Sequence, residues 1–285
     1  MTLAQLAPLA IEMSIVLSVL GFGLNATFAD EIAFLRKPRL LLRAVFAMNV
    51  VMFALAMAAV LLLDLPPALK VGLVVLALSP VPPAMPRRFV MAGSSVSAAV
   101  RLVTAVSVMA IAIVPLGVTL GGILVGRDLR MPISTVASAV LIRVIFPLTI
   151  GIALRSYAPS VAERMVRPLL RSATVLLLLG AVSLLFVVWP ILSTMFGYGV
   201  LSALVLFSLS GLAIGHVAGG PDESHRTLLA LATSARHPGM MLTMAGINFP
   251  GEHGVVAIAI FHVFVAALVA APYLAWRRRS QARSG

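Results

Sequence analysis

The sequence predicts an all-α integral membrane protein with about nine transmembrane helices, two of them discontinuous. Of its 285 residues, 61% are hydrophobic and only 11% are charged, whereas a soluble domain is about half apolar and about a quarter charged. The apolar runs are about 20 residues long, the length of a helix that crosses the hydrocarbon core, rather than the short alternating segments of a transmembrane barrel. Proline residues interrupt two of these runs.

Nine apolar segments are the expected spans, and most of the charge lies in the short stretches between them. The third and the eighth contain the interruptions, and the fifth stands alone at the centre of the chain. The expected spans are 8–28, 40–63, 68–92, 94–125, 133–154, 168–190, 199–217, 224–247 and 253–276.

The basic residues at the ends of these segments support this count. If the spans alternate in direction, three basic residues (Lys70, Arg127 and Arg130) fall on one side of the membrane and thirteen on the other. By the positive-inside rule the thirteen lie in the cytoplasm. We therefore expect a multi-pass protein of the cell (inner) membrane, with its C-terminus in the cytoplasm and its N-terminus outside. The thirteen follow the first span (Arg36, Lys37, Arg39), end the third (Arg87, Arg88), follow the fifth (Arg155, Arg164, Arg167), precede the eighth (Arg226) and form the tail (Arg277, Arg278, Arg279, Arg283).

Several functional classes are disfavoured by composition. The net charge of +12 does not indicate nucleic-acid binding, because the arginines fall in short loops between spans. Cysteine is absent, so neither disulfides nor thiolate chemistry is expected. The N-terminus lacks a basic region followed by a small-residue cleavage site, so no cleaved signal peptide is expected. We see no nucleophile–base–acid set, phosphate loop or metal-ligand cluster, and we expect neither an enzyme nor a cofactor or metal site.

The third span is expected to be a broken helix. Its sequence, "LKVGLVVLALSPVPPAMPRRFVMAG" (69–93), places Pro80, Pro82, Pro83 and Pro86 close together. Each proline removes a backbone donor and clashes with the preceding turn, so a continuous helix is excluded. In hydrocarbon the freed carbonyl groups need partners, so an unwound stretch survives only when it is buried in protein or lines a wet cavity.

The eighth span is the counterpart of the third. "RTLLALATSA" and "MMLTMAGINF" are each too short to cross the bilayer, and His237, Pro238 and Gly239 divide them. Both interrupted segments end in Met-Ala-Gly, at 91–93 and 244–246.

The order of the spans predicts an inverted repeat. Four spans, a linker span and four spans of opposite sense give a first repeat at 1–125, a linker at 126–160 and a second repeat at 161–285. Interrupted helices at matching positions of inverted halves are typical of the substrate site of a secondary transporter. Exposed helix N-termini carry partial positive charge and Arg236 adds a full charge, which favours a small organic anion as the substrate.

At these residues the sequence resembles the bile acid:sodium symporter family, within a wider group that includes auxin efflux carriers and arsenite permeases. The matching stretches are "GFGLNATFADEIAFLRKPRLLL" (21–42), "MAGSSVSAAVRLVTAVS" (91–107) after the proline-rich break, and "ATSARHPGMMLTMAG" (232–246). The resemblance implies two crossed discontinuous helices, a core domain and a flatter panel domain. Some members have ten spans, so the first would be missing here.

The sequence departs from this family at the sodium sites. The resemblance implies a Ser-Asn pair after the first break and a Glu and a Gln at the second. Here Pro83, Ala84 and Met85 offer no side-chain oxygen, and Arg236 or His237 falls near the Glu position. Two unit charges about 4 Å apart interact by about 4 kcal/mol at an effective dielectric constant of about 20. We therefore expect no sodium coupling through the usual sites; protons, or no coupling ion, are the alternatives.

Several residues are candidates for the site, each with a structural alternative. Arg236 could bind the substrate anion or supply a built-in positive charge in place of the cation, or it could pair with backbone carbonyls at the break. His237, Glu12 and His262 are candidates for ion coupling; His237 could instead cap freed carbonyls, and Glu12 could pair with Arg143 or Arg101. The candidate substrate-binding residues are Arg236, His237, Pro83, Ala84, Met85, Thr233, Ser234, Thr104, Ser107 and Asn25.

Three functional classes can be compared on this basis. The favoured one is a secondary active transporter of a small organic anion, in which two domains rock about the crossover to give alternating access. The alternative is a membrane ligand-sensing or scaffold module without transport, in which Arg236 is structural. A membrane-embedded enzyme is disfavoured because no acid–base pair or metal set is visible.

Overall fold

The computed structural model describes residues 3–27, 38–195 and 199–284, and every regular element in these ranges is a helix. The all-α membrane fold class predicted from the sequence is confirmed. Part of the first family motif, together with Arg36 and Lys37, lies outside the described residues. The elements are α1 (Leu3–Gly23), α3 (Pro38–Val45), η1 (Phe46–Val51), α4 (Met52–Leu62), α5 (Pro67–Leu78), α6 (Pro86–Met91), α7 (Val96–Val125), α8 (Ile133–Val140), η2 (Leu141–Ile145), α9 (Phe146–Tyr157), α10 (Pro159–Met195), α11 (Val200–Ala218), α12 (Glu223–Ser234), α13 (Pro238–Asn248) and α14 (His253–Ser284).

Within the described ranges, seven continuous helices are long and apolar enough to cross a membrane. Two of them, α3–η1–α4 and α8–η2–α9, contain a π-helical segment, η1 and η2. The chain is therefore a multi-pass membrane protein. The count of nine spans, the inverted repeat and its boundaries remain predictions. The seven are Leu6–Gly23, Pro38–Leu62, Val96–Val125, Ile133–Tyr157, Pro159–Thr194, Val200–Ala218 and Gly254–Ser280.

The third and eighth predicted spans are each two short helices, as expected. Helix α5 ends at Leu78 and α6 begins at Pro86, so the proline-rich stretch between them is not helical. Helix α12 ends at Ser234 and α13 begins at Pro238. Proline is suited to the first turn of a helix, where its missing N–H would have no intrahelical acceptor. At the first break Pro80 follows the end of α5 and Pro86 begins α6, whereas at the second break proline only begins the following helix, at Pro238.

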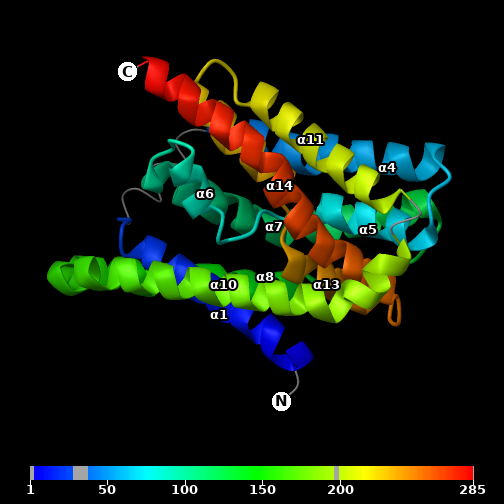
Figure 1. Cartoon of the computed structure of the whole chain (residues 1–285), viewed down its shortest axis with the longest axis horizontal. Coiled ribbons are helices and arrows are strands. Elements are labelled where there is room, and N and C mark those ends of the chain that lie inside the picture. Colours follow the sequence, from blue (N-terminus) through cyan, green and yellow to red (C-terminus); the bar gives the residue numbers. More distant parts are fainter. Residues whose placement is uncertain (1–2, 28–37, 196–198, 285) are drawn as a thin grey trace.

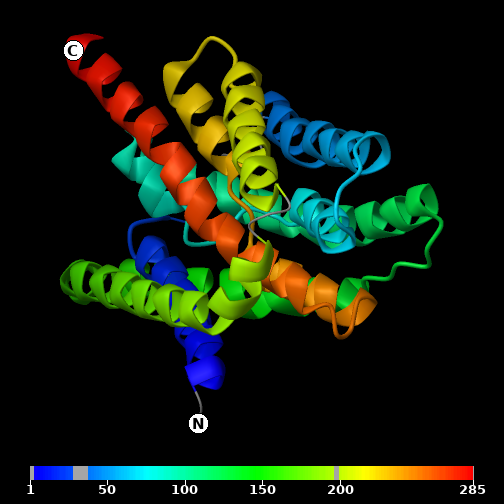
Figure 2. The same cartoon turned by 45° about the vertical axis from the view of Figure 1, so that its right-hand side comes forward.

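The helices form two groups (Figures 1 and 2). Helices α1, α9 and α10 pack on one another, and with α8 and η2 they form what we call the panel layer, at the bottom of both views. The other helices form the core bundle, which includes both interrupted segments; α13 lies next to the panel layer in Figure 1. Helix α14 crosses the core bundle and also contacts α10 of the panel layer. The boundary between the two groups is consistent with the core and panel domains that the family resemblance implies.

Helices α11 and α12 pack with their backbones nearly in contact. Gly211, Gly215 and Gly219 recur every four residues along one face of α11 and its C-cap. A Cβ atom added at Gly215 would lie 2.3 Å from the carbonyl oxygen of Leu229 and 2.6 Å from the Cα of Ala230. Small residues at this spacing let membrane helices approach closely. This contact holds α12, and therefore the second interruption, in place.

Replacing Gly215 with alanine should destabilise the protein, because the new methyl group has to push α12 away from α11. A loss of about 1–3 kcal/mol is expected for overpacking of this kind. Thermal unfolding of the purified protein in detergent measures the effect. Gly246→Ala is the matched control, because a Cβ at Gly246 meets no atom within 4 Å. Equal melting temperatures for the two variants would contradict the close α11–α12 contact.

Candidate functional site

The two interrupted segments meet directly inside the core bundle. The backbone N–H of His237 donates to the carbonyl oxygen of Pro80 at 2.8 Å. In return, the Ser79 hydroxyl donates to the carbonyl oxygen of His237 at 2.8 Å. Ser79 is 0% exposed and His237 is 7% exposed. Each break therefore supplies a donor to the other, as the absence of water in hydrocarbon requires. We call this pair of contacts the crossover.

The guanidinium group of Arg236 adds two further hydrogen bonds beside the crossover. Its Nη1 donates to the carbonyl oxygen of Ser79 at 3.3 Å, and its Nη2 donates to the carbonyl oxygen of Met48 at 3.0 Å. The guanidinium carbon lies 5.7 Å from the centroid of the Phe207 ring, within the range of a cation–π contact. Arg236 is 2% exposed. It therefore joins the second break to the end of α5 and to the π-helical segment η1.

The position of Arg236 bears on the roles expected for it. The cavities next to the crossover are not lined by Arg236, and both of its terminal nitrogens are used on protein carbonyl groups. Its Nε has no partner among the described residues. This geometry favours a built-in positive charge in place of a cation over direct contact with a substrate. Both roles remain predictions.

Three neighbouring cavities lie where the panel layer faces α13 and the crossover. Their volumes are about 320, 290 and 20 Å³. They share lining residues, so we treat them together as the panel–core crevice. Arg143 lines all three. Glu12 and Thr243 line the two larger ones, and His237 lines the smallest and one of the larger.

An ion pair lies in this crevice. Nη2 of Arg143, on η2, lies 2.6 Å from a carboxylate oxygen of Glu12, on α1. The two side chains are 27% and 51% exposed. The sequence already marks Arg143 as an ionisable residue in the middle of a span, which indicates function by default. It was nevertheless absent from the expected substrate-binding residues, because its position beside His237 depends on how the panel layer packs.

His237 is oriented by the start of α13. The backbone N–H of Met240 donates to Nδ1 of His237 at 3.4 Å, so the side chain caps the helix. Because Nδ1 accepts this bond, the ring proton of neutral His237 lies on Nε2. The capping alternative considered for His237 is therefore present in the structure. Its expected proton role remains a prediction.

The structure brings together only part of the expected site. Pro83 and Ser107 line the smallest cavity of the crevice with His237, and Glu12 lines its larger ones. The other expected substrate-binding residues, besides Arg236, do not line the crevice; they are Ala84, Met85, Thr233, Ser234, Thr104 and Asn25.

The contacts of some of these residues are local. Met85 is 5% exposed and belongs to an apolar cluster. Ser234 donates to the carbonyl oxygen of Leu231 at 3.1 Å, within its own helix, and Asn25 donates to that of Gly21 at 3.2 Å. Thr233 is fully buried, and its hydroxyl has no partner among the described residues. Their expected roles as ligands remain predictions.

His262 is buried in the core bundle and does not line the crevice. It is 1% exposed, and its ring meets that of Phe207 edge-on, with centroids 5.7 Å apart. Phe207 thus contacts both His262 and the Arg236 guanidinium. Neither ring nitrogen of His262 has a hydrogen-bond partner in the described part of the chain. The expected ion-coupling role of His262 remains a prediction.

Four backbone carbonyl oxygens lie at or next to the crossover. Those of Ser79, Pro80, His237 and Met48 each accept a hydrogen bond from the protein. Among the described residues, no group of three His, Asp or Glu side chains is placed to hold a metal ion.

Interrupted helices that meet in the interior of a helical membrane protein, beside a cavity, are typical of a secondary transporter. Comparison with known families matches residues 12–194 to the Sodium Bile acid symporter family. This range is more than half of the chain, and the chain belongs to that family. It includes the first interruption and Arg143 but ends before α11, so Arg236 lies outside it. Comparison with curated proteins finds no match.

Substituting Ser79 with alanine tests the crossover. The change removes one of two donors to the buried carbonyl of His237, which keeps the backbone N–H of Met241 at 3.2 Å. A loss of about 0.5–1.5 kcal/mol in the free energy of unfolding is therefore expected. Thermal unfolding in detergent measures it. Ser193→Ala is the control, because the exposed Ser193 hydroxyl only donates within its own helix, to the carbonyl of Pro190. Equal unfolding free energies for the two variants would contradict the crossover contact.

Proposed function

We propose that this protein is a secondary active transporter of a small organic anion, working by alternating access without the family's usual sodium sites. The proposal that the usual sodium sites are absent rests on the contacts of the Arg236 guanidinium with the carbonyl oxygens of Ser79 and Met48. A bound cation would need oxygen ligands at this crossover. Here the guanidinium already satisfies two of them and supplies the positive charge.

A sodium ion beside Arg236 would be both repelled and poorly coordinated. Two unit positive charges about 4 Å apart repel by about 4 kcal/mol at an effective dielectric constant of about 20. Displacing the guanidinium would also leave its buried N–H donors without these two acceptors, which costs about 1–3 kcal/mol or more for a charged group. The tethered charge therefore holds the crossover together without a bound ion.

The panel–core crevice is the proposed substrate site. Arg143 is its positive group, and a guanidinium can pair with a carboxylate through two parallel hydrogen bonds. The ion pair with Glu12 occupies Arg143 when no substrate is bound. An entering carboxylate would take the place of Glu12, and the freed Glu12 could then accept a proton. This exchange couples substrate to proton without requiring sodium, and His237 lies in the same crevice.

Movement of the panel layer against the core bundle would open this crevice to each side in turn. The crevice lies on the boundary between the two groups of helices, so a small rotation changes its access while the crossover stays intact. The positive-inside rule orients the molecule with its C-terminus in the cytoplasm. The proposed location is the cell membrane, and the proposed partners are the substrate anion, protons and the lipid bilayer.

Transport of carboxylates by this protein should not require sodium. We expect carboxylates that bind the protein to enter proteoliposomes at rates that change less than twofold when an imposed sodium gradient is replaced by a potassium gradient. The panel should include aliphatic, aromatic and bile-acid carboxylates. A steep rise in uptake with the sodium gradient would refute the role given to Arg236. Binding without any flux would favour the ligand-sensing alternative.

Arg143→Gln should weaken substrate binding. Hydrogen bonds to charged groups contribute about 1.5–3 kcal/mol, so at least a tenfold rise in Kd is expected for carboxylates that stabilise the native protein in a thermal-shift titration. Arg155→Gln is the matched control, because Arg155 forms a comparable pair with Glu163, at 2.9 Å, outside the crevice. If both variants bind the same carboxylates as tightly as the native protein, the crevice is not the substrate site.

A further inference from the structure

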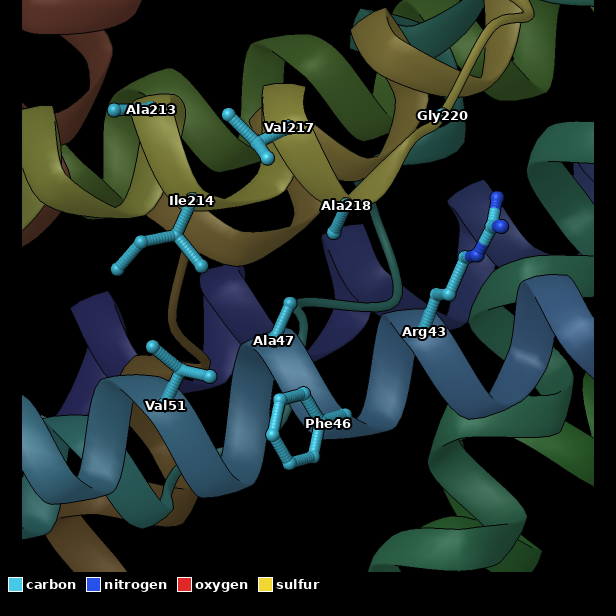
Figure 3. Close-up of a pocket in the computed structure, with 9 residues that line it drawn as sticks. All are labelled: Arg43, Phe46, Ala47, Val51, Ala213, Ile214, Val217, Ala218 and Gly220. Carbon is cyan, nitrogen blue, oxygen red and sulfur yellow. The ribbon is translucent and has the colours of Figure 1, made fainter.

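A second cavity lies on the face of the core bundle that is turned away from the panel layer. It is a groove of about 590 Å³ between α3–η1 and α11 (Figure 3). All but one of the residues that line it are apolar or glycine. The groove is lined by Arg43, Phe46, Ala47, Val51, Ala213, Ile214, Val217, Ala218 and Gly220.

The apolar part of the groove opens on the surface of the protein. Phe46 is 59% exposed and Val217 is 80% exposed, although both belong to helices that are apolar enough to cross a membrane. From Arg43 to Val51 the groove follows eight residues, which is about 12 Å at about 1.5 Å per residue. A groove of this length and composition, open to the bilayer, suits the first part of an acyl chain.

The single charged residue stands at one end of the groove. Figure 3 shows Arg43 beside Gly220, with Val51 and Ile214 at the other end. A Cβ placed on Gly220 would lie 2.5 Å from Nη1 of Arg43, so the guanidinium rests against the backbone of this turn. Arg226 reaches the same turn, where its Nε donates to the carbonyl oxygen of Gly220 at 2.5 Å. Two guanidinium groups therefore flank one glycine.

The two carboxylates of this turn, Asp222 and Glu223, have partners other than Arg43. Asp222 accepts a hydrogen bond from the backbone N–H of His225 at 2.9 Å and caps α12. Glu223 pairs with Arg277 at 3.2 Å. In the described part of the chain, Arg43 itself has neither an ion pair nor a hydrogen bond through its side chain. An anionic ligand would therefore complement Arg43, which has no carboxylate partner among the described residues.

We propose that this groove binds one anionic phospholipid of the cytoplasmic leaflet. Its phosphate contacts Arg43 beside Gly220, and an acyl chain lies along Phe46 and Ile214. Arg226, among the residues that the positive-inside rule assigns to the cytoplasm, is at the same turn. Basic pockets between transmembrane helices on this side of a membrane bind anionic headgroups. The site is separate from the panel–core crevice and does not depend on which substrate is transported.

Native mass spectrometry of the delipidated full-length protein tests the site. Dioleoylphosphatidylglycerol should bind at least fivefold more tightly than dioleoylphosphatidylcholine, the factor that corresponds to about 1 kcal/mol per basic residue near an anionic surface. Arg43→Gln should lose this preference, and Arg43→Lys should keep most of it. Arg127→Gln is the control, because Arg127 is also exposed, lies in a loop on the opposite predicted side and is far along the chain from the groove. It should keep the preference in full.

A second variant tests the groove independently of the charge. Ala213→Phe, at an exposed position on α11, fills the groove and should weaken binding of the anionic lipid severalfold even if Arg43→Gln does not fold. Soluble glycerol 3-phosphate should not compete, because it lacks the acyl chain. Equal affinity for the two lipids, an unchanged preference in both Arg43→Gln and Ala213→Phe, or full competition by glycerol 3-phosphate would each overturn the proposal.

Discussion

The constraint on which the rest of the structure depends is the need to pair every backbone polar group that lies in the interior of a membrane protein. Two helices of this chain are broken by proline, and each break frees carbonyl groups that no water can reach in hydrocarbon. The breaks meet, and each supplies a donor to the other through Ser79 and His237. Arg236 pairs carbonyl oxygens that these two donors do not reach. Neither break could be buried alone without an energetic cost of several kcal/mol.

Each of the two π-helical segments places one group beside this crossover. Segment η1 presents the carbonyl of Met48 to Arg236, and η2 carries Arg143 into the crevice. A π-helical turn adds one residue to a helix without ending it, and such turns are common at functional sites. The crossover and the crevice thus depend on two local departures from α-helical geometry in helices that are otherwise continuous. One belongs to the core bundle and the other to the panel layer.

The seven long apolar helices and the two breaks could be predicted, because they follow from local properties of the chain, namely apolar length and proline position. The predicted span 168–190 is shorter than helix α10, which already begins at Pro159. The residues before position 168 include several charged ones, which lower the hydropathy of this stretch but do not prevent a helix. The partners of Arg236 could not be predicted, because Met48 is 188 residues away. Arg143 was noticed as a mid-span cation, yet its place beside His237 depends on packing between the two layers. The π-helical segments leave no distinct pattern in the amino-acid sequence.

The guanidinium of Arg236 is a covalent part of the protein. Unlike a bound ion, it cannot be released into the compartment on the other side of the membrane. If Arg236 stands where relatives bind a cation, each transport cycle returns that charge to its starting point and draws no work from a cation gradient. The largest accumulation ratio is then determined by the membrane voltage acting on the net charge carried and by whatever else is released, such as a proton or a second anion. The side chain that stabilises the crossover would in this way also limit how far uphill the protein can pump.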